Sequence, residues 1–178
     1  MHRGKLQGWA VRDYDEGSAQ LIESFKEQGV TSLAKYFAKP MAVAIFESVN
    51  HHDVLVVPPS RPEAHRRRGY LPAQMLAEAL AKELKGLGRQ VFVARRALVF
   101  TKSVADQSGL TVQQRFGNLA GALCADSALS GRNVILVDDI VTTGATLLEC
   151  RRAIIEAGAN FRFFSTFAET KSKMATKI

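Results

Sequence analysis

Residues 134–146, with the sequence VILVDDIVTTGAT, constrain the fold more than any other part of the chain. An apolar run, residues 134–137, ends in two adjacent carboxylates, Asp138 and Asp139, and a loop of threonines and glycine follows. Such a run is typical of a strand buried on both faces of a parallel sheet. Residues 145–158 have apolar side chains at helical spacing and end in glycine, which predicts a helix directly after the loop.

Strand and helix patterns alternate along the rest of the chain. We predict an α/β domain with a mainly parallel central sheet flanked by helices. Residues 1–16 and the arginine-rich stretch around 60–68 are expected to be irregular, and Pro40 is expected to stop or start a helix. The predicted strands are residues 53–59, 90–100, 133–139 and 161–168, and the predicted helices are residues 18–39 (two, broken near Gly29), 41–49, 71–88, 145–158 and one that starts at Thr111.

Two of these segments carry a more detailed prediction. Thr111 and Gln114 have the spacing of a capping box at a helix start. The phenylalanines of residues 161–168 do not alternate cleanly. This predicts a strand buried on both faces, and not a platform on which nucleic-acid bases stack.

Length and composition indicate one globular domain. The chain has 178 residues, of which 47% are hydrophobic. We expect a single domain over residues 1–170, with N-terminal helices or a small hood in residues 1–50, a core in residues 51–168 and a flexible tail in residues 171–178. An apolar stretch long enough for a transmembrane helix is absent, and so is a secretory signal, so we expect a cytoplasmic protein with no membrane partner.

Cysteine usage and charge restrict the kinds of site. Cys124 and Cys150 are far apart and form no CxxC pair, which excludes a disulfide scaffold or a cysteine-based zinc site within this chain. We interpret both as buried thiols. The net charge of +7 suits nucleic acid, membrane phosphates or small anionic substrates. Arginines are locally dense in residues 61–68, which form either an anion site or a solvated basic turn.

The loop after the predicted strand has the chemistry of a phosphate site. Ligands of an open parallel sheet bind outside the carboxyl ends of the strands, and a helix N-terminus attracts anions. Gly144 lets the backbone approach a ligand, and Thr142, Thr143 and Thr146 add hydroxyl donors. The two carboxylates cannot hold a phosphate, but they can accept hydrogen bonds from sugar hydroxyls or face a divalent cation. A 5-phosphorylated ribose has both parts. The alternative is a threonine that merely caps the helix, with incidental acids.

This motif resembles the phosphoribosyl pyrophosphate (PRPP) signature of type I phosphoribosyltransferases along its full length. Residues 56–84 and 106–123 also resemble the two signature blocks of ComF-type proteins, the group of competence protein F and predicted amidophosphoribosyltransferases. The resemblance covers residues 14–168. Two departures stand out: the family's RGFNQ is RGYLP here (residues 68–72), and the family's usual N-terminal zinc ribbon is missing, so we expect a truncated or a naturally short variant.

The resemblance implies the type I fold with a small hood and a set of ligand contacts. Asp138 and Asp139 would bind the ribose hydroxyls, and Asp139 is the nearest candidate for a catalytic base. Mg²⁺ would be held by the substrate and water, without a direct protein ligand. The 5′-phosphate would lie on Thr142, Thr143, Gly144, Ala145 and Thr146, the pyrophosphate on Pro59, Ser60, Arg61, Arg66 and Arg68, and a flexible loop over residues 100–113 would contribute Lys102 and Gln107. Arg115 and Asn118 match the ComF block without an assigned role.

Three functions are compatible with these residues. The first is transfer of phosphoribosyl from PRPP to an unknown acceptor with release of pyrophosphate. The second is a non-catalytic PRPP sensor, and the third is an accessory protein of DNA uptake; in both, the basic surface would bind nucleic acid. A glutaminase half with a cysteine nucleophile is absent from these residues, so the chain alone should not take nitrogen from glutamine. A homodimer is the default expectation, since two-fold dimers are the commonest oligomers.

Overall fold

A computed structural model describes residues 2–3, 6–102, 104 and 111–170 of the protein. A six-stranded sheet with the order β1-β2-β8-β7-β3-β4 forms its centre, and a separate pair is formed by β5 and β6. The pairing of β1 with β2 is antiparallel, whereas β2, β8, β7, β3 and β4 run parallel. The strands are β1 (His2–Arg3), β2 (Leu6–Asp13), β3 (Val54–Val56), β4 (Phe92–Val93), β5 (Leu98–Phe100), β6 (Leu123–Ala125), β7 (Asn133–Val141) and β8 (Asn160–Glu169). The predicted α/β fold with a mainly parallel sheet is confirmed.

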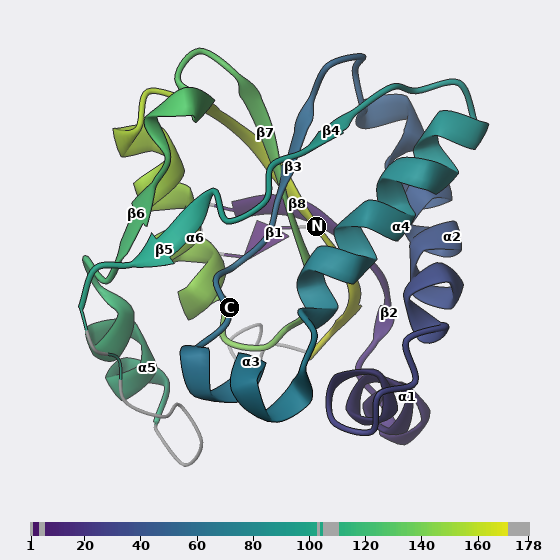
Figure 1. The fold of residues 1–178 in the computed structure, drawn as a ribbon, viewed down its shortest axis with the longest axis horizontal. Helices are drawn as coiled ribbons and strands as arrows, with labels where there is room; N and C mark the ends of the chain where they lie inside the picture. Colours follow the sequence, from purple (N-terminus) through teal and green to yellow (C-terminus); the bar gives the residue numbers. More distant parts are fainter. Residues whose placement is uncertain (1, 4–5, 103, 105–110, 171–178) are drawn as a thin grey trace, which may run out of the picture.

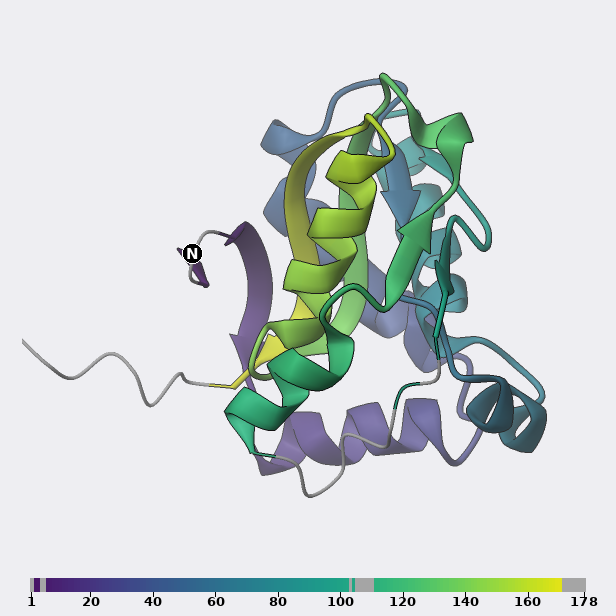
Figure 2. The same ribbon diagram turned by 90° about the vertical axis from the view of Figure 1, so that its left-hand side faces the viewer.

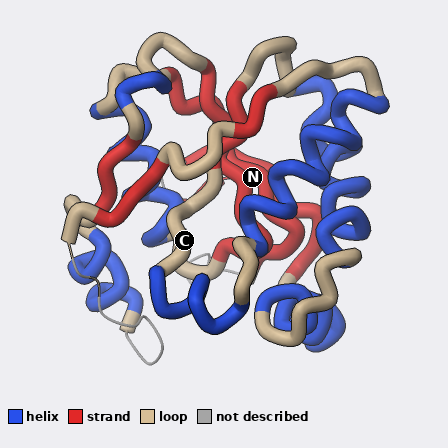
Figure 3. Tube along the Cα trace, in the orientation of Figure 1, coloured by secondary structure: helices blue, strands red, loops and turns tan. Residues whose placement is uncertain are grey.

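Helices cover both faces of this sheet (Figures 1 and 3). One face packs against α1 (Glu16–Lys26), α2 (Leu33–Ile45) and α4 (Pro72–Gly86), and the other against α6 (Ala145–Glu156) and the β5–β6 pair. The side chains of β7 divide between the two cores, as alternation along a strand requires. Ile135 and Val137 belong to the α2–α4 core, whereas Val134 and Leu136 belong to the α6 core.

The carboxyl ends of the parallel strands lie next to three helices. The helices α3 (Pro62–Arg68) and α5 (Val112–Leu119) lie there together with α1, at the lower end of the molecule in Figures 1 and 2. Two 3₁₀ turns, Phe46–Ser48 and Ser127–Leu129, lie elsewhere in the described chain. The lower end is therefore the edge at which an open parallel sheet binds its ligands.

Several local predictions are wrong. Residues 1–16 are not irregular throughout, because β2 pairs with β8 and its Leu6 is fully buried. The arginine-rich stretch is a helix, α3, with a proline in its first turn and Gly69 at φ +74° after its end. Pro40 lies inside α2, between the fully buried Phe37 and Met41, so packing outweighs the proline's cost. The strand predicted at 90–100 is two short strands, between which Arg96 has φ +55°.

Other local predictions are confirmed. Thr111 Oγ1 accepts from the Gln114 N–H at 3.3 Å, and Gln114 Oε1 accepts from the Thr111 N–H at 2.8 Å, which is the predicted capping box. The phenylalanines of β8 face both cores: Phe163 and Phe167 pack on the α2–α4 side and Phe164 on the α6 side, with a register shift near the start of the strand. The proposed hood in residues 1–50 stays a prediction, and residues 171–178 lie outside the described residues.

Candidate functional site

The loop between β7 and α6 is built around Gly144. This glycine is the N-cap of α6 and has φ +82°, a left-handed conformation that residues with a side chain rarely adopt. No side chain caps this helix end, although Thr143 Oγ1 accepts from the Ala145 N–H at 3.4 Å. The start of α6 therefore keeps backbone N–H groups for an anion, with threonine hydroxyls beside them.

Asp138 and Asp139 project toward opposite faces of the sheet. Asp138 has the parity of Val134 and Leu136, so it faces the α6 side, and it is half-buried. Asp139 faces the other side and is 1% exposed. Its Oδ1 lies 2.7 Å from the ammonium group of Lys26, the last residue of α1. Its Oδ2 is buried and accepts no hydrogen bond from the described residues. Of the two carboxylates, Asp138 alone shares a face with α6.

The two carboxylates and Lys26 are electrostatically linked. Burial, and then the neighbouring charge of Asp139, raise the pKa of Asp138 to about 7, while Lys26 opposes that rise. Burial would lower the pKa of Lys26, but the charges of Asp139 and Asp138 outweigh it and the pKa is raised. Burial and the charge of Asp138 also hold the pKa of the buried Cys150 well above its usual value, so this residue stays a thiol.

The predicted pyrophosphate residues lie in and after the connection from β3 to α3. Pro59, Ser60 and Arg61 are half-buried there. On α3, the exposed Arg66 pairs with Glu63 at 3.4 Å. Arg68 instead forms an ion pair with Glu27, the residue directly after α1.

Glu27 also pairs with Arg67, which the sequence did not single out, at 2.9 Å. Hydrogen bonds from Arg68 and Arg67 lower the pKa of the Glu27 carboxyl. The hydroxyl of Tyr70 donates to the carbonyl of Phe25 at 2.6 Å and lies 3.1 Å from that of Lys26. The end of α1 is thus attached both to the arginine helix and, through Lys26, to β7.

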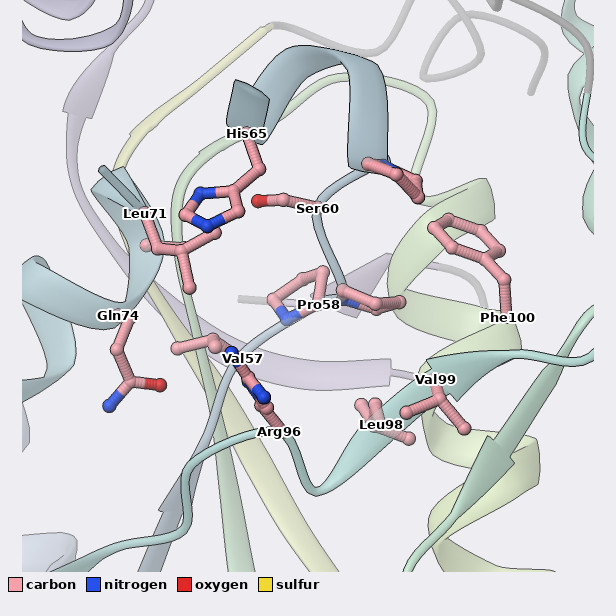
Figure 4. Close-up of a pocket in the computed structure, with 13 residues that line it drawn as sticks. Val57, Pro58, Ser60, His65, Leu71, Gln74, Arg96, Leu98, Val99 and Phe100 are labelled. Atoms are coloured by element: carbon pink, nitrogen blue, oxygen red, sulfur yellow. The ribbon is translucent and has the colours of Figure 1, made fainter. Parts of the chain in front are cut away.

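A pocket of about 400 Å³ adjoins the predicted pyrophosphate loop (Figure 4). Its walls are largely apolar, and Ser60, His65, Gln74 and Arg96 supply polar groups. None of the residues 138–146 is among those that line it. The lining residues are Val57, Pro58, Pro59, Ser60, Pro62, His65, Leu71, Ala73, Gln74, Arg96, Leu98, Val99 and Phe100.

The predicted flexible-loop contacts are only partly described. Lys102, just after β5, is exposed, and its ammonium donates to the carbonyl of Ala120 at 2.6 Å. Gln107 lies outside the described residues. Arg115 and Asn118 lie on α5, half-buried. The predicted role of Lys102 as a loop contact therefore stays a prediction.

A second hollow, of about 820 Å³, is lined by β2, α2 and β8. It combines cations with an aromatic ring: Arg12, Lys35 and Lys39 line it together with Tyr36, which is 57% exposed. Arg12 also pairs with Asp15 at 2.8 Å. We call this surface the basic groove; its remaining lining residues are Val11, Ser32, Pro40 and Phe167.

Sequence reasoning missed Lys26, Glu27 and the basic groove. A lysine and a glutamate at a helix end are usually solvated. No local spacing links Lys26 to Asp139, which is more than 100 positions away, or Glu27 to Arg67 and Arg68, which are 40 and 41 positions away. Cys124 is exposed, so its prediction as a buried thiol is wrong, whereas Cys150 is buried as predicted. Within the described residues, no three His, Cys, Asp or Glu side chains gather as a metal site. Over the same part of the chain, no helix is long and apolar enough to cross a membrane.

Known proteins resemble this chain in sequence and in fold. The model of the phosphoribosyl transferase domain matches residues 38–176. The DNA utilization protein YhgH of Escherichia coli is 26% identical over 154 residues, which are 84% of this chain and 66% of that protein. Competence protein F of Haemophilus influenzae is 28% identical over 156 residues, with 83% and 66% covered. The chain thus spans 66% of the length of these curated relatives.

A solved structure agrees with these sequence matches. The hypoxanthine-guanine phosphoribosyltransferase of Bacillus anthracis superposes with a TM-score of 0.50 at 14% identity, over 83% of this chain and 75% of that chain. At this identity the likeness concerns the fold alone.

Proposed function

The chain belongs to the phosphoribosyl transferase domain family, and on that premise we propose that it binds PRPP and transfers the phosphoribosyl group to an acceptor. The observation that carries the proposal is the arrangement at the carboxyl end of β7. A half-buried carboxylate, a left-handed glycine, three threonines and an uncapped helix N-terminus follow one another there within nine residues.

The chemical parts of PRPP would divide among these groups. The 5′-phosphate would accept N–H donors from residues 144–146 and hydroxyls from Thr142, Thr143 and Thr146. Asp138 would accept hydrogen bonds from the ribose hydroxyls, since it faces the same side as α6. In this conformation Asp139 is covered by Lys26, so its predicted contact with ribose and its role as a base would require that pair to open.

Transfer would displace pyrophosphate from ribose C1. The acceptor's lone pair forms the new bond to C1, the bond to the pyrophosphate oxygen breaks, and its electron pair leaves with pyrophosphate. Negative charge grows on the leaving group, so cations near residues 59–68 would stabilise the transition state. Arg66 is exposed and its pairing with Glu63 is a surface ion pair of small energy, so this side chain can turn to a ligand. Arg68 would have to exchange Glu27 for pyrophosphate oxygens.

Mg²⁺ is the cofactor that this reaction implies. The described residues offer a single half-buried carboxylate, Asp138, beside the loop and no cluster of ligating side chains. This donor set fits an ion carried mainly by pyrophosphate and water, as Mg²⁺ commonly is. Bound in this way, the ion would neutralise charge on the leaving group.

The test is calorimetric titration of PRPP with Mg²⁺ into the wild-type protein, Asp138→Asn and the double variant Asp138→Asn/Asp139→Asn. A charge-assisted hydrogen bond contributes about 1.5–3 kcal/mol, so Asp138→Asn should weaken binding roughly 10–100-fold, and the double variant should lose it. Glu47→Gln, an exposed acid before β3 at the other end of the sheet, is the matched control and should bind like the wild type.

Turnover needs a separate measurement, because binding alone does not establish transfer. Pyrophosphate release would be followed while nucleobases and amines are screened as acceptors. Release that depends on an acceptor and on Asp138 would establish a transferase, whereas tight binding without release for any acceptor would favour a PRPP sensor. A folded wild-type protein that binds no PRPP would exclude both.

The basic groove favours a second candidate function, binding of single-stranded nucleic acid without catalysis. Lys35, Lys39 and Arg12 can contact phosphates while the exposed ring of Tyr36 stacks with a base. The names of the relatives, a DNA utilization protein and a competence protein, support this candidate.

Fluorescence anisotropy with a labelled DNA oligonucleotide would test this candidate. Affinity should fall steeply with salt, and Lys35→Ala/Lys39→Ala should reduce both the affinity and the salt slope. Lys82→Ala/Lys85→Ala, two exposed lysines of α4, is the control of equal charge change. Equal losses in both double variants would indicate non-specific attraction to a basic protein.

A further inference from the structure

Lys26 reaches the carboxylates from a helix that the motif does not include. The buried Ile22 and Phe25 fix α1 against the sheet, and the Tyr70 hydroxyl donates to the carbonyl of Phe25. Lys26 is the last residue of α1, where the helix dipole also favours a cation. Its side chain is 31% exposed, and its ammonium lies 2.7 Å from Asp139 Oδ1.

The charges around this contact are unbalanced without Lys26. Asp138 and Asp139 are sequence neighbours, and the Asp139 N–H donates to Asp138 Oδ1 at 2.9 Å. Two carboxylates so close, one of them 1% exposed, oppose each other's ionisation. Four other charged or titratable groups near the trio belong to the described residues. Arg68 acts on Lys26 from α3, Glu27 follows Lys26, the Tyr70 hydroxyl lies at the Phe25 and Lys26 carbonyls, and the neutral thiol of Cys150 faces Asp138 from α6.

We propose that Lys26 is a positioning residue of the ribose site: by compensating the charge of Asp139, it keeps Asp138 a carboxylate that can accept the ribose hydroxyls. This inference rests on the proposed function, because it assigns a role within PRPP binding. The effects of the two charges on Asp138 agree with this role, since Asp139 raises the pKa of Asp138 and Lys26 lowers that pKa. A protonated Asp138 would retain only part of its acceptor capacity.

The test measures Mg·PRPP affinity by calorimetry from pH 5.5 to 8.5 for the wild type, Lys26→Met, Lys26→Arg and Lys82→Met. For each variant, the midpoint is the pH at which the PRPP affinity is halfway between its low-pH and high-pH values. The phosphates of PRPP titrate in the same range, so the informative quantity is the difference in this midpoint between variants. Lys26→Met should raise the midpoint and weaken binding at pH 7, by up to about tenfold for each pH unit by which the midpoint rises. Lys26→Arg should restore the wild-type profile, and Lys82→Met, an exposed lysine of α4, should not change it.

A charge cycle separates this electrostatic role from a structural one. Asp139→Asn removes the charge that Lys26 compensates, so its midpoint should fall below that of the wild type. Lys26→Met/Asp139→Asn should have a midpoint below that of Lys26→Met. Loss of a packing contact alone would lower neither of these two midpoints. If Lys26→Met does not fold, the two variants with Asp139→Asn still give one arm of the cycle, because Lys26 should lower the midpoint there too.

The outcomes distinguish the inference from the function on which it rests. If the wild type and Lys82→Met bind PRPP but Lys26→Met has the same midpoint as the wild type, Lys26 has no such role and the proposed function stands. If neither the wild type nor any variant binds PRPP, the proposed function fails, and the role of Lys26 in the ribose site fails with it. A ¹³C NMR titration of the Asp138 carboxyl in the ligand-free protein measures the charge effect itself, and an unchanged Asp138 pKa in Lys26→Met would overturn it.

Discussion

At the scale of single residues, the main finding is that Asp138 and Asp139 have different environments although they are adjacent. Strand geometry turns Asp138 toward α6 and Asp139 toward α1, where Lys26 covers it. Asp138 has no ion-pair partner among the described residues, and burial raises its pKa to about 7. The protein thus holds a costly charge at the place where a ligand's hydroxyls would satisfy it, as expected of a functional site.

Asp138→Asn should therefore stabilise the ligand-free protein above neutral pH. The folded-state pKa of Asp138 is raised from 3.8 to about 7, so between these values the folded state binds more protons than the unfolded state. The free energy of unfolding consequently falls as pH rises through this window. Asparagine removes the charge, and we expect a gain at pH 8 of at least about 1 kcal/mol, which raises Tm by about 2–4 °C for a chain of this size.

Thermal unfolding of both proteins at pH 4 and pH 8 measures this effect. At pH 4 the wild-type Asp138 is already protonated in the folded state, so the two Tm values should nearly agree. Asp126→Asn is the matched control, because this exposed residue caps a 3₁₀ turn and asparagine can keep that cap. A gain for Asp138→Asn that is equal at both pH values would contradict the electrostatic explanation.

How far the sequence predicts the site also depends on single residues. The loop and its acids could be predicted because residues 134–146 form one continuous stretch, in which the apolar run, the two acids and the threonine-glycine loop follow one another. Lys26 was not found, because its contact with Asp139 depends on where α1 docks, which no local pattern records. Arg68 was predicted to bind a pyrophosphate, and in the structure it forms an ion pair with Glu27.

At the scale of elements, β2 shows what local patterns leave out. Its sequence, LQGWAVRD, contains a glycine near its start and ends in Arg12 and Asp13, so it does not resemble a buried strand. Pairing with β8 nevertheless makes it part of the central sheet. Gly8 lies opposite Phe164, and a Cβ at this position would be 2.4 Å from the ring of that fully buried side chain. The glycine is therefore what allows β2 to approach β8.

Gly8→Ala should destabilise the protein by about 1–3 kcal/mol, because the added methyl group overpacks a filled core. The Phe164 ring cannot move freely, since it is fully buried between β8 and α6. Gly17→Ala is the matched control: its Cβ would meet only Asp15, at 3.7 Å, and it lies in α1, where alanine is favoured by roughly 0.5–1 kcal/mol. Urea denaturation measures both, and equal changes would show that β2 does not depend on this close approach.

Other elements divide in the same way between local and tertiary causes. α4, α6 and the start of α5 were predictable, because apolar spacing and caps lie within each segment. α3 was missed although Pro62 and Gly69 mark its two ends, because the arginines between them suggested a loop. The short strands β5 and β6 pair across 22 residues of intervening sequence; β5 lies within the strand predicted at 90–100, whereas β6 was not evident from its own sequence.

At the scale of the whole molecule, a buried ion pair and the candidate site lie at opposite ends of the sheet. Asp53, just before β3, is fully buried, and its Oδ2 accepts from Arg162 at 2.5 Å and from the Asn50 N–H at 2.9 Å. Arg162 lies near the start of β8, and β7 lies between β8 and β3 in the sheet. The ion pair therefore spans the central strand at its amino end, whereas the candidate site lies at the carboxyl end.

Asp53→Asn should lower stability without changing PRPP affinity. Removing one partner of a buried ion pair typically costs about 3–5 kcal/mol, and we expect the lower part of that range, since Arg162 is 26% exposed and can turn partly to water. Arg95→Gln, which removes an exposed ion pair with Glu78, should change stability by about 1 kcal/mol or less. Urea denaturation gives the two costs, and calorimetry at a temperature where both variants are folded gives their PRPP affinities. If Asp53→Asn weakens PRPP binding while Arg95→Gln does not, the two ends of the sheet are coupled, and residues 134–141 of β7, which join them, are the element through which that coupling would pass.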